Sequence, residues 1–273
     1  MDYNKIVSLV YEARRIVFNP AMLAEVSMKN PYDYVTAVDT EISNFMKERL
    51  HELYPDIGFM TEEEQEHRFS GRCFILDPID GTTNLLHGYQ MSSISLAYAE
   101  DGKTVFGVVF NPFTKEMFFS VKGKGAHLYK TDRGITQLLS KGVENYTANS
   151  LSVSNRKLSE AVIEFGAGSS KKHLADSTFG RAKRVFTSCL DLRRICSTAL
   201  AISYVAAGRI DGYFEQFIHP WDYAAAILFL EEAGGKSSNW QSEPLPLDKD
   251  GSIVCTNGVF HNELIDILNG GDQ

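Results

Sequence analysis

The chain has 273 residues, of which 44% are hydrophobic and 23% are charged, and its formal net charge is −8. This apolar fraction excludes disorder for most of the chain, and the acidic balance argues against sequence-independent nucleic-acid binding, which relies on a basic surface. No apolar run approaches the roughly 20 residues of a membrane-spanning helix, and no signal-peptide pattern opens the chain, so we expect a cytoplasmic protein. The four cysteines form no C-x-x-C pair, so we expect neither a zinc cage nor a disulfide framework.

The first half of the chain predicts two helices followed by strands. Apolar residues at helical spacing predict helices over 4–18 and 38–54, with Asp39 and Thr40 as candidate caps of the second. Short apolar or alternating runs between turn residues then predict strands, the later ones as an antiparallel meander. These strands lie at 57–60, 73–76, 93–99, 105–110 and 116–121.

Strands and helices alternate beyond a polar, irregular segment at 140–150. Strands are predicted near 162–166, 183–187, 211–215 and 252–255, and helices near 170–178, 195–207, 222–233 and from 259. Mixed elements throughout predict a layered α/β (α+β) sandwich rather than a barrel of repeated βα units. We place a seam in the polar segment, which divides the chain into an α+β half over 1–145 and an α/β half over 146–273, packed as one compact unit.

The most informative motif is D-P-I-D-G-T-T at 77–83, which directly follows an apolar run. Pro78 fixes its own φ and lacks a backbone donor, so we expect the strand to end there. The two aspartates can converge, and because converging carboxylates repel, a hard cation such as Mg²⁺ is the natural counter-charge. A helix starting at Thr82 would add free N–H groups beside that cation, and the two features together describe a phosphate site.

Each acidic motif also has a plain structural interpretation. A D-x-x-D-G string is usually a turn with capping aspartates, and E-E-E at 62–64 could be a solvated loop. Asp222 begins an apolar helix, where it could simply favour the helix macrodipole. Glu62 nevertheless follows one predicted strand as Asp77 follows another, so two neighbouring strand ends would bring these carboxylates together.

In combination, these motifs resemble the inositol monophosphatase family, the lithium-sensitive, magnesium-dependent phosphomonoesterases. The resemblance covers nearly the whole chain. The matching strings are D-Y-V-T-A-V-D at 33–39, F-M-T-E-E at 59–63, F-I-L-D-P-I-D-G-T-T-N at 74–84, G-R-I-D-G-Y-F-E at 208–215, W-D at 221–222 and E-A-G-G at 232–235. The resemblance implies an α-β-α-β-α sandwich of the sugar-phosphatase type and a homodimer.

The resemblance also implies two or three Mg²⁺ ions per site. The first would take Glu62, Asp77 and the carbonyl of Ile79 as ligands. The second would take Asp77, Asp80 and Asp222, and a third would use Glu62 and waters. Most of these ligands lie in 1–145, whereas Asp222 and the substrate-side loop lie in 146–273. From the second-metal role we expect that Asp80→Asn abolishes turnover and leaves the fold intact.

Catalytic and substrate-binding roles follow from the same resemblance. Asp39 and Thr82 match the pair that orients and deprotonates the attacking water, with Glu62 as the third catalytic residue, and Lys29 matches a lysine near a mobile loop that closes over the site. The implied phosphate- and substrate-binding residues are Gly81, Thr82, Thr83, Cys196, Ser197, Thr198, Glu215 and Asp222.

The substrate-side motif departs from the resemblance. The family motif commonly reads R-S-x-G-[ST]-A, whereas residues 193–198 read R-R-I-C-S-T. Arg194 replaces a small residue, Cys196 replaces glycine and Thr198 replaces alanine. Bulkier groups there would alter the floor of the leaving-group pocket, so inositol 1-phosphate is in doubt as the only substrate.

We therefore predict Mg²⁺-dependent hydrolysis of a small phosphomonoester by metal-activated water, with inositol 1-phosphate as the leading substrate. Relatives with the same metal core hydrolyse fructose 1,6-bisphosphate, adenosine 3′,5′-bisphosphate or the 2′-phosphate of NADP(H), and these remain alternatives. A binding or regulatory protein that has lost turnover and an acidic structural protein without metal are alternatives of other classes. The expected partners are a small phosphorylated metabolite and a second copy of the chain, with no nucleic acid and no membrane.

Other phosphate motifs are not matched. Neither the D-x-D pair of aspartyl-phosphate enzymes nor the C-x-x-x-x-x-R of cysteine phosphatases is formed by Asp77 or Cys73. The string at 166–172 lacks the spacing of a phosphate-binding P-loop, so we predict a strand-to-helix turn. The basic cluster of Arg181, Lys183 and Arg184 is expected on the surface, where it would meet an extra phosphate only if it lay near the site.

Overall fold

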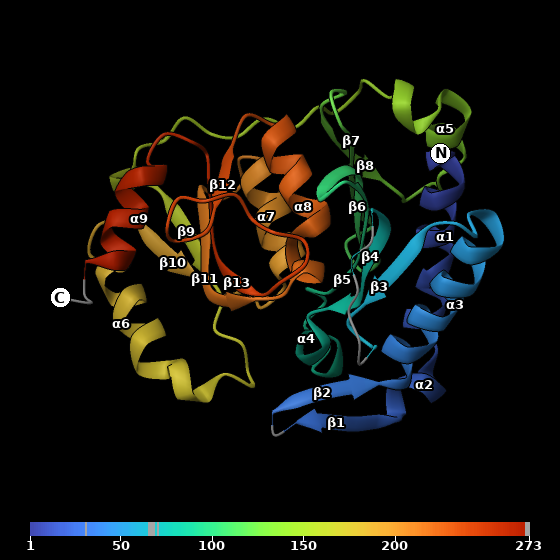
Figure 1. The fold of residues 1–273 in the computed structure, drawn as a ribbon, viewed down its shortest axis with the longest axis horizontal. Coiled ribbons are helices and arrows are strands. Elements are labelled where there is room, and N and C mark those ends of the chain that lie inside the picture. The colour runs from blue at the N-terminus through green and yellow to red at the C-terminus, as the bar shows by residue number, and fades with distance from the viewer. Residues whose placement is uncertain (31, 65–68, 70, 271–273) are drawn as a thin grey trace.

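A computed structural model describes residues 1–30, 32–64, 69 and 71–270, and it does not describe the side chains of Lys29, Asn30 and Asp33. Within these residues the strands form a six-stranded sheet in the order β3-β4-β5-β6-β7-β8, a five-stranded sheet in the order β10-β9-β11-β13-β12, and the two-stranded hairpin β1-β2 (Figure 1).

The strands of the six-stranded sheet are β3 (Gly58–Thr61), β4 (Arg72–Asp80), β5 (Ser93–Glu100), β6 (Lys103–Asn111), β7 (Glu116–Val121) and β8 (Ala126–Lys130). Those of the five-stranded sheet are β9 (Val162–Phe165), β10 (Asp191–Arg193), β11 (Gly212–Ile218), β12 (Lys236–Ser238) and β13 (Gly251–Thr256). The hairpin consists of β1 (Val26–Asn30) and β2 (Asp33–Thr36).

The helices begin with α1 (Tyr3–Val17), α2 (Pro20–Ala24), α3 (Ala37–Leu53), α4 (Thr82–Leu86) and α5 (Thr136–Lys141). They continue with α6 (Ala175–Phe186), α7 (Thr198–Ala206), α8 (Pro220–Glu232) and α9 (His261–Asn269). Three short 3₁₀ turns lie at 143–145, 158–160 and 172–174. Across the described residues, no helix has both the length and the apolar character needed to cross a membrane.

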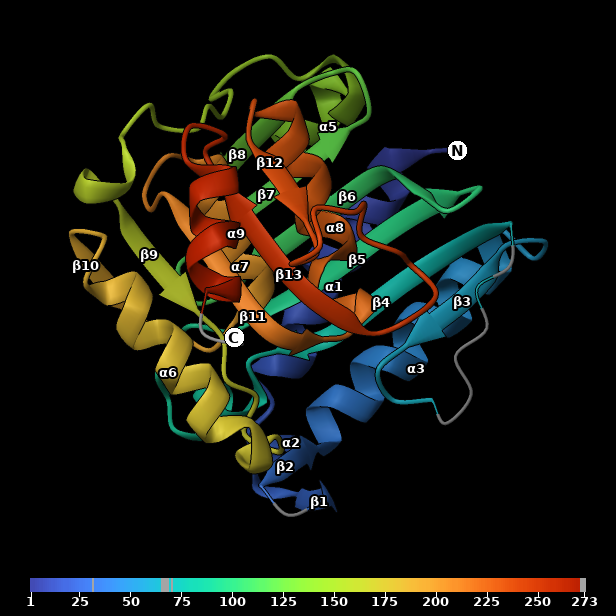
Figure 2. The ribbon, with the colours of Figure 1, turned by 60° about the vertical axis from the view of Figure 1, so that its left-hand side comes forward.

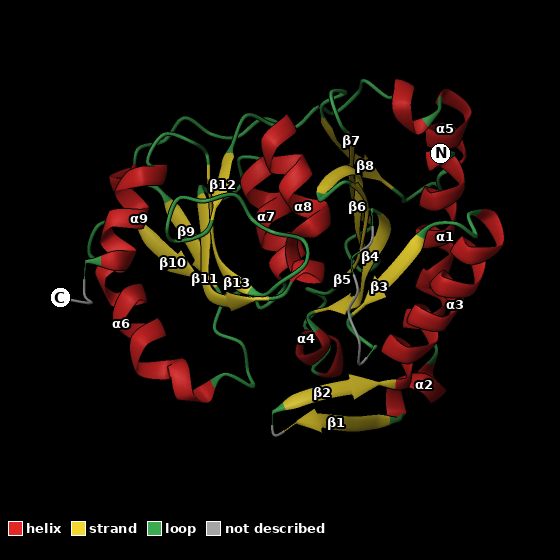
Figure 3. Ribbon diagram, in the orientation of Figure 1, coloured by secondary structure: helices red, strands yellow, loops and turns green. Residues whose placement is uncertain are grey.

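The elements stack in five alternating layers. Helices α1 and α3 cover the outer face of the six-stranded sheet, α7 and α8 lie between the two sheets, and α6 and α9 cover the outer face of the five-stranded sheet (Figures 1 and 3). Buried apolar side chains fill the interfaces as three clusters: one between α1, α3 and the six-stranded sheet, one on both sides of α7 and α8, and one between the five-stranded sheet and α6 and α9. The predicted α-β-α-β-α sandwich is therefore confirmed.

Small residues allow α8 to lie directly against the six-stranded sheet. A Cβ placed on Gly107 of β6 would lie 2.6 Å from the carbonyl oxygen of Ala225 in α8, so only glycine permits this approach. The adjacent Thr104 donates a hydrogen bond to the carbonyl of Ala224 at 2.8 Å. Close packing here fixes the position of α8, which carries Asp222 at its N-terminal end.

Strand β4 differs from the prediction at its C-terminal end. The sequence predicted that Pro78 ends the strand, but β4 continues to Asp80, which pairs with Ser93 of β5. The register shifts between Asp77 and Asp80, and this irregularity accommodates a proline that cannot donate to the ladder. Both aspartates therefore belong to one strand end, at the edge where α4 begins.

The segment around α6 was predicted incorrectly. The expected helix near 170–178 and strand near 183–187 are in fact one helix, Ala175–Phe186, preceded by a short 3₁₀ turn. Its buried residues Thr178, Arg181, Ala182 and Val185 recur at helical spacing, a pattern that the polar residues between them obscured in the sequence. Strands β8 and β12, the β1–β2 hairpin and helix α2 were not predicted either, because most of these elements are short or half polar.

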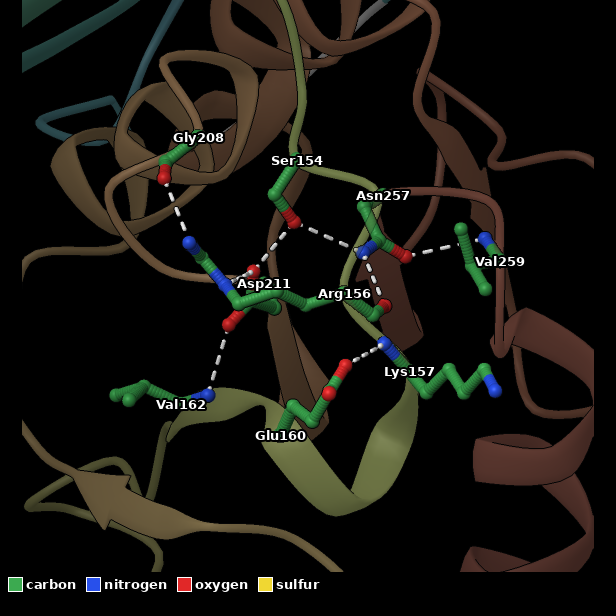
Figure 4. Close-up of polar contacts among 9 residues, drawn as sticks. All are labelled: Ser154, Arg156, Lys157, Glu160, Val162, Gly208, Asp211, Asn257 and Val259. Atoms are coloured by element: carbon green, nitrogen blue, oxygen red, sulfur yellow. Dashed lines mark hydrogen bonds and ion pairs between the residues drawn. The ribbon is translucent and has the colours of Figure 1, made fainter.

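The segment that leads into β9 is fixed by a polar network around Asp211, which is fully buried (Figure 4). The carboxylate of Asp211 accepts hydrogen bonds from the hydroxyl of Ser154, from Arg156 Nε at 2.8 Å and from the backbone N–H of Val162 at 2.8 Å. Asn257 donates to the hydroxyl of Ser154 at 3.0 Å, which ties this segment to the end of β13.

We expect Asp211→Ala to lower the free energy of unfolding by about 2–4 kcal/mol, because it leaves a buried N–H and a charged guanidinium without their acceptor. Urea denaturation measures the change. The control is Glu52→Ala, which removes an exposed ion pair with Arg49 and should leave the midpoint nearly unchanged. Equal midpoints for the two variants would contradict the importance of this network.

Candidate active site

Apart from Asp39, the predicted catalytic, metal-binding and substrate-binding residues line one cleft of about 440 Å³, to which both sheets contribute. The described residues around it include Tyr34, Glu62, Asp77, Ile79, Asp80, Gly81, Thr82, Thr83, Glu164, Cys196, Ser197, Thr198, Tyr213, Glu215, Trp221 and Asp222. In Figure 1 this edge of the molecule carries α4, the β1–β2 hairpin and the loop that leads into α6. Asp39 is not among the lining residues and lies one contact behind Thr82.

Asp77 is a buried carboxylate of the cleft with an oxygen that lacks a hydrogen-bond partner within the described part of the chain. Its side chain is 2% exposed, and its Oδ1 has no hydrogen-bond partner among the described residues. Burial raises the pKa of Asp77 well above its ordinary value, and the negative charges of Glu62, Asp80, Asp222 and Asp39 raise it further. A buried oxygen that lacks a donor and faces other carboxylates is a position where a cation would relieve repulsion.

Glu62 reaches this position because β3 and β4 are parallel neighbours. Their register pairs Thr61 with Leu76, so Glu62, which follows the end of β3, lies beside Asp77, which is still within β4. The backbone N–H of Glu62 also donates to the carbonyl of Leu76 at 3.3 Å. This is the neighbouring arrangement of strand ends that the sequence suggested.

Asp80 connects the two halves of the molecule. Its carboxylate accepts hydrogen bonds from the hydroxyls of Ser93 at 3.1 Å and of Ser197, and from the backbone N–H groups of Thr198 at 2.9 Å and Ala199 at 3.0 Å. Burial raises the pKa of Asp80 even though these four donors lower it. Only one of the four bonds falls on Oδ1, so that oxygen keeps a free lone pair.

These bonds change the expectation for Asp80→Asn. The carboxylate of Asp80 anchors the first turn of α7 and also faces the other acidic groups. An asparagine would place an NH₂ group, which is itself a donor, against backbone N–H donors, so a hydrogen bond to α7 would be lost. A loss of turnover in this variant would therefore mix a structural effect with a chemical one. Asp77, whose Oδ1 has no donor among the described residues, is the better position for a test.

Asp222 lies in the first turn of α8. Its carboxylate accepts a hydrogen bond from the backbone N–H of His219 at 2.9 Å, which completes a capping arrangement. Burial raises the pKa of Asp222 well above its ordinary value, and the charge of Glu62 adds to the effect. The residue thus caps a helix, as its structural interpretation suggested, and it also belongs to the acidic cluster.

Asp39 and Thr82 are in contact. The Thr82 hydroxyl lies 3.1 Å from Asp39 Oδ1 and 3.1 Å from the carbonyl oxygen of Ile79. The predicted caps of α3 were wrong: the N-cap is Thr36, and Asp39 is the third residue of the helix, accepting a bond from the Thr36 N–H at 2.8 Å. Because Asp39 is 1% exposed and fixed from behind, it holds the Thr82 hydroxyl at the cleft wall.

Gly81 shapes the turn between β4 and α4. Its φ is +92°, and a Cβ there would lie 3.0 Å from the carbonyl oxygen of Met91 and 3.1 Å from that of Cys196. Glycine is therefore required on both counts. Thr82 and Thr83 follow in the first turn of α4, where backbone N–H groups have no acceptor within the helix.

The donor set fits a hard cation, although it does not form a closed set of ligands. Within the described ranges, no group of three or more His, Cys, Asp or Glu side chains is placed so that it could hold an ion as it stands. The facing groups are oxygen donors only, and the buried Oδ1 of Asp77 is unpartnered. Carboxylate and carbonyl oxygens are the ligands that Mg²⁺ prefers.

Glu215 lies further along the cleft wall, on β11. Its carboxylate accepts hydrogen bonds from the Tyr213 hydroxyl at 2.6 Å and from the Gly168 N–H at 3.2 Å. Burial raises the pKa of Glu215 to about 7. The neighbouring Thr198 hydroxyl lies 2.9 Å from the Tyr213 oxygen, so these side chains form one polar wall.

Cys196 occupies a strained backbone position on the opposite side. Its φ is +64°, in the left-handed region where glycine is favoured, and this agrees with the glycine of the resembled motif. The Asn84 side chain holds the turn by donating to the carbonyls of Met91 and Ile195, each at 2.7 Å. The cysteine that stands here is exposed.

Glu164 was missed by the sequence analysis. It lies on β9 and is 1% exposed; its Oε1 accepts a hydrogen bond from the Ile195 N–H at 2.7 Å, whereas its Oε2 has no partner among the described residues. Burial raises the pKa of Glu164 to about 8. One signal was available: a single carboxylate inside the otherwise apolar run of Val162, Ile163 and Phe165.

In metal-free protein, the free energy of unfolding should fall as the pH rises from about 4.5 to about 8. The pKa of Glu164 is higher in the folded state, at about 8, than its ordinary value of 4.5, so protonation stabilises the fold and this contribution is lost across that window. Each pKa unit corresponds to about 1.4 kcal/mol.

Urea denaturation in the presence of a chelator, repeated from pH 4.5 to 8.5, measures this slope. Glu164→Gln should flatten the curve, while Glu12→Gln, an exposed control on α1, should reproduce the wild-type slope. Identical slopes for wild type and Glu164→Gln would show that Glu164 does not titrate in this window.

Lys29 lies in β1, but its side chain is outside those that the structure describes. The segment at 166–171 is a turn between β9 and the 3₁₀ turn before α6, as predicted. Of the basic cluster, Arg181 is buried rather than on the surface. Arg181 and Arg184 donate to the carbonyls of Ile267 and Leu268 at the end of α9, where cations favour the helix dipole.

Comparisons with known proteins agree on one family. The profile of the "Inositol monophosphatase family" matches residues 4–271. An inositol-1-monophosphatase of Rhizobium meliloti is 36% identical over 97% of this chain and 95% of its own length. The Nus factor SuhB of Pasteurella multocida is 35% identical over 77% of this chain and 73% of its own. The solved IMPase of Thermotoga maritima has a TM-score of 0.82 at 27% identity, covering 98% of this chain and 96% of that one.

Proposed function

We propose that this chain, which belongs to the inositol monophosphatase family, hydrolyses a small phosphomonoester with Mg²⁺ as cofactor, and that inositol 1-phosphate is its leading substrate. The family uses Mg²⁺. The single observation that carries the proposal is the buried, unpartnered Oδ1 of Asp77 inside a cleft whose other carboxylates raise the pKa of Asp77. Such an oxygen is a ligand position rather than a structural acceptor.

The ligand assignment is the one that the family resemblance implies, and the residues that it names line one cleft. Glu62, Asp77 and the Ile79 carbonyl would hold one Mg²⁺, and Asp77, Asp80 and Asp222 would hold a second; a third would use Glu62 and waters. Bound Mg²⁺ supplies charge neutralisation for the phosphate and makes hydroxide accessible near neutral pH. The free lone pair on Asp80 Oδ1 and the unpartnered oxygen of Asp77 support this assignment.

Asp39, Thr82 and Glu62 would act on the attacking water. The Thr82 hydroxyl donates to Asp39 Oδ1, so its lone pairs are directed at the cleft and can accept a proton from water. As that proton arrives, the hydroxyl proton passes to Asp39, which is fixed by Thr36 and cannot turn away. Glu62, which also lines the cleft, would help to orient the water. The pair therefore positions and deprotonates the nucleophile without forming a covalent phosphoenzyme.

The phosphate would be held by the backbone N–H groups of Gly81, Thr82 and Thr83 at the start of α4. The leaving group would contact the wall formed by the Cys196, Ser197 and Thr198 segment together with Glu215 and Asp222. Glu215 presents carboxylate oxygens that can accept hydrogen bonds from hydroxyl groups of a polyol.

The other assignments are also proposals. We propose a cytoplasmic protein, as the sequence predicted, and a seam near residue 145, where the six-stranded sheet is complete and the five-stranded sheet has not begun. We also propose a homodimer, supported by exposed apolar side chains of Phe179, Phe186 and Leu190 around α6. Light scattering measures the dimer directly. Lithium sensitivity remains a prediction.

Phosphate release from a substrate panel tests the function. The panel contains inositol 1-phosphate, fructose 1,6-bisphosphate, adenosine 3′,5′-bisphosphate and NADP, each with and without Mg²⁺. We expect Mg²⁺-dependent release, and the ranking distinguishes inositol monophosphatase from the three alternatives. If Mg²⁺ stabilises the protein but no substrate of the panel releases phosphate, the result would favour the alternative of a binding or regulatory protein that has lost turnover.

A further inference from the structure

The catalytic cleft continues into a smaller hollow of about 90 Å³. Eight residues line both spaces, so they are adjoining parts of one depression: Gly166, Ala167, Gly168, Lys171, Lys172, Arg194, Glu215 and Phe217. Glu215, which faces the leaving group in the proposed function, therefore lies at the junction. The hollow extends away from the acidic cluster, along the segment between β9 and α6.

Three cations, Lys171, Lys172 and Arg194, line this extension. None of them makes an ion pair with a carboxylate of the described residues; each is held by a neutral group instead. Lys171 Nζ lies 4.0 Å from the centre of the Phe217 ring, Lys172 Nζ lies 5.3 Å from that of Tyr32, and Arg194 Nη2 donates to the Ala167 carbonyl at 2.7 Å. These contacts position the cations without neutralising them, and Glu215, whose pKa the charge of Arg194 lowers, is the carboxylate that lines the hollow with them.

Two other arginines do form ion pairs: Arg193 pairs with Asp191, and Arg209 pairs with Glu116. In a chain with a net charge of −8, three cations beside one carboxylate along the wall of a hollow are a local reversal of charge. Such a wall favours an anionic ligand over a neutral one. Arg194 uses one of its five N–H donors on Ala167, so a planar fork remains for a phosphate.

Arg194 also departs from the resembled motif, which carries a small residue at this position. A serine there could not reach a ligand group that lies beyond Glu215. The basic wall is therefore a property of this chain rather than of the shared metal core. The loop that carries Lys171 and Lys172 is fixed by Ser169, whose hydroxyl donates to the Tyr32 carbonyl at 2.6 Å. Figures 1 and 2 both place the N-terminal end of α6 beside the β1–β2 hairpin.

We propose that the hollow beside Lys171, Lys172 and Arg194 is a binding subsite for a second phosphate group, so that the preferred substrates are bisphosphates. The inference rests on the proposed phosphatase function, and it ranks bisphosphates above inositol 1-phosphate as the preferred substrates. One phosphate lies over the N-terminal turn of α4 among the acidic ligands and is hydrolysed. The second is bound and not cleaved, and the polyol or ribose between them passes Glu215.

Matched pairs of substrates test the proposal. The pairs are inositol 1-phosphate with inositol 1,4-bisphosphate, glucose 1-phosphate with glucose 1,6-bisphosphate, and 3′-AMP with adenosine 3′,5′-bisphosphate. Wild-type protein should show kcat/KM about tenfold or more higher for the bisphosphate of at least one pair, the size expected of one charge-assisted contact. The pair that responds distinguishes a sugar from a nucleotide.

Arg194→Ser, which restores the small residue of the resembled motif, should reduce this ratio towards one. The matched control is Arg193→Ser, which removes the neighbouring arginine outside the hollow and should leave the ratio unchanged. A wild-type ratio near one on every pair would overturn the proposal. So would an Arg194→Ser variant that loses rate on both members of a pair in equal proportion, because Arg194 would then only shape the loop.

Affinity measurements test the phosphate subsite independently of the proposed phosphatase activity. In an Asp77→Asn background, calorimetry measures affinity for both members of each pair without turnover. Tighter binding of a bisphosphate that is lost with Arg194→Ser supports the subsite even if no substrate is hydrolysed. Equal affinities for a pair that the wild type hydrolyses leave the phosphatase function intact and overturn the subsite.

Discussion

Asp77→Asn is expected to lower kcat/KM by at least about a thousandfold and, in metal-free protein, to raise the melting temperature by several degrees. The two changes have opposite signs for one reason. Asp77 is buried among four other carboxylates that raise its pKa, so its charge destabilises the fold unless a cation is bound. The introduced amide is neutral and can donate to neighbouring carboxylates, but it cannot replace an anionic ligand.

Steady-state phosphate release and thermal denaturation in the presence of a chelator measure the two effects. Asp56→Asn, an exposed substitution after α3, is the control and should change neither. A variant that keeps near-native turnover would remove Asp77 from the catalytic site. A variant that loses turnover and also melts lower without metal would mean that Asp77 is a structural acceptor after all.

Thr82→Val should lower kcat by about 10²- to 10⁴-fold, with a smaller effect on KM. The substitution keeps the shape of the side chain and removes the hydroxyl that links Asp39 to the cleft, where it lies 3.1 Å from Asp39 Oδ1. Deprotonation of water then loses its relay, while the carboxylates and the backbone N–H groups of α4 remain.

Thr82→Ser is the matched control, because it keeps the hydroxyl and should retain most of the activity. Steady-state kinetics on the best substrate of the panel compare the two variants. Activity of Thr82→Val within about tenfold of wild type would show that the proton leaves by another route, since general-base catalysis contributes more than that.

The local sequence predicted most of the elements that carry the site. Helices α1 and α3, the meander from β4 to β7, and helices α7 and α8 have regular apolar patterns, and the structure contains them. The errors lie in segments whose secondary structure is determined by tertiary contacts rather than by the local sequence. Helix α6 has a buried arginine on its inner face, which conceals the helical period of its apolar residues. The β1–β2 hairpin is too short and too polar to give a recognisable strand pattern.

The sequence predicted most of the residues that line the cleft, but it predicted few of the contacts among them. The parallel pairing of β3 and β4 explains why Glu62 lies beside Asp77, and that pairing could be anticipated from two strand ends with acidic residues. The anchoring of α7 by Asp80 joins residues more than a hundred positions apart, and no local pattern encodes it. Glu164 was hidden for the same reason, because its partner Ile195 lies on a distant loop.

A Mg²⁺ titration of the melting temperature, run in parallel on wild type and Asp77→Asn, tests the central claim most directly. A ligand that binds only the folded state must raise the midpoint in proportion to the logarithm of its concentration once the site is saturated. We predict such a rise for the wild type and a much smaller one for Asp77→Asn. A wild-type midpoint that does not respond to Mg²⁺, or an equal rise in both proteins, would contradict a magnesium site built on Asp77.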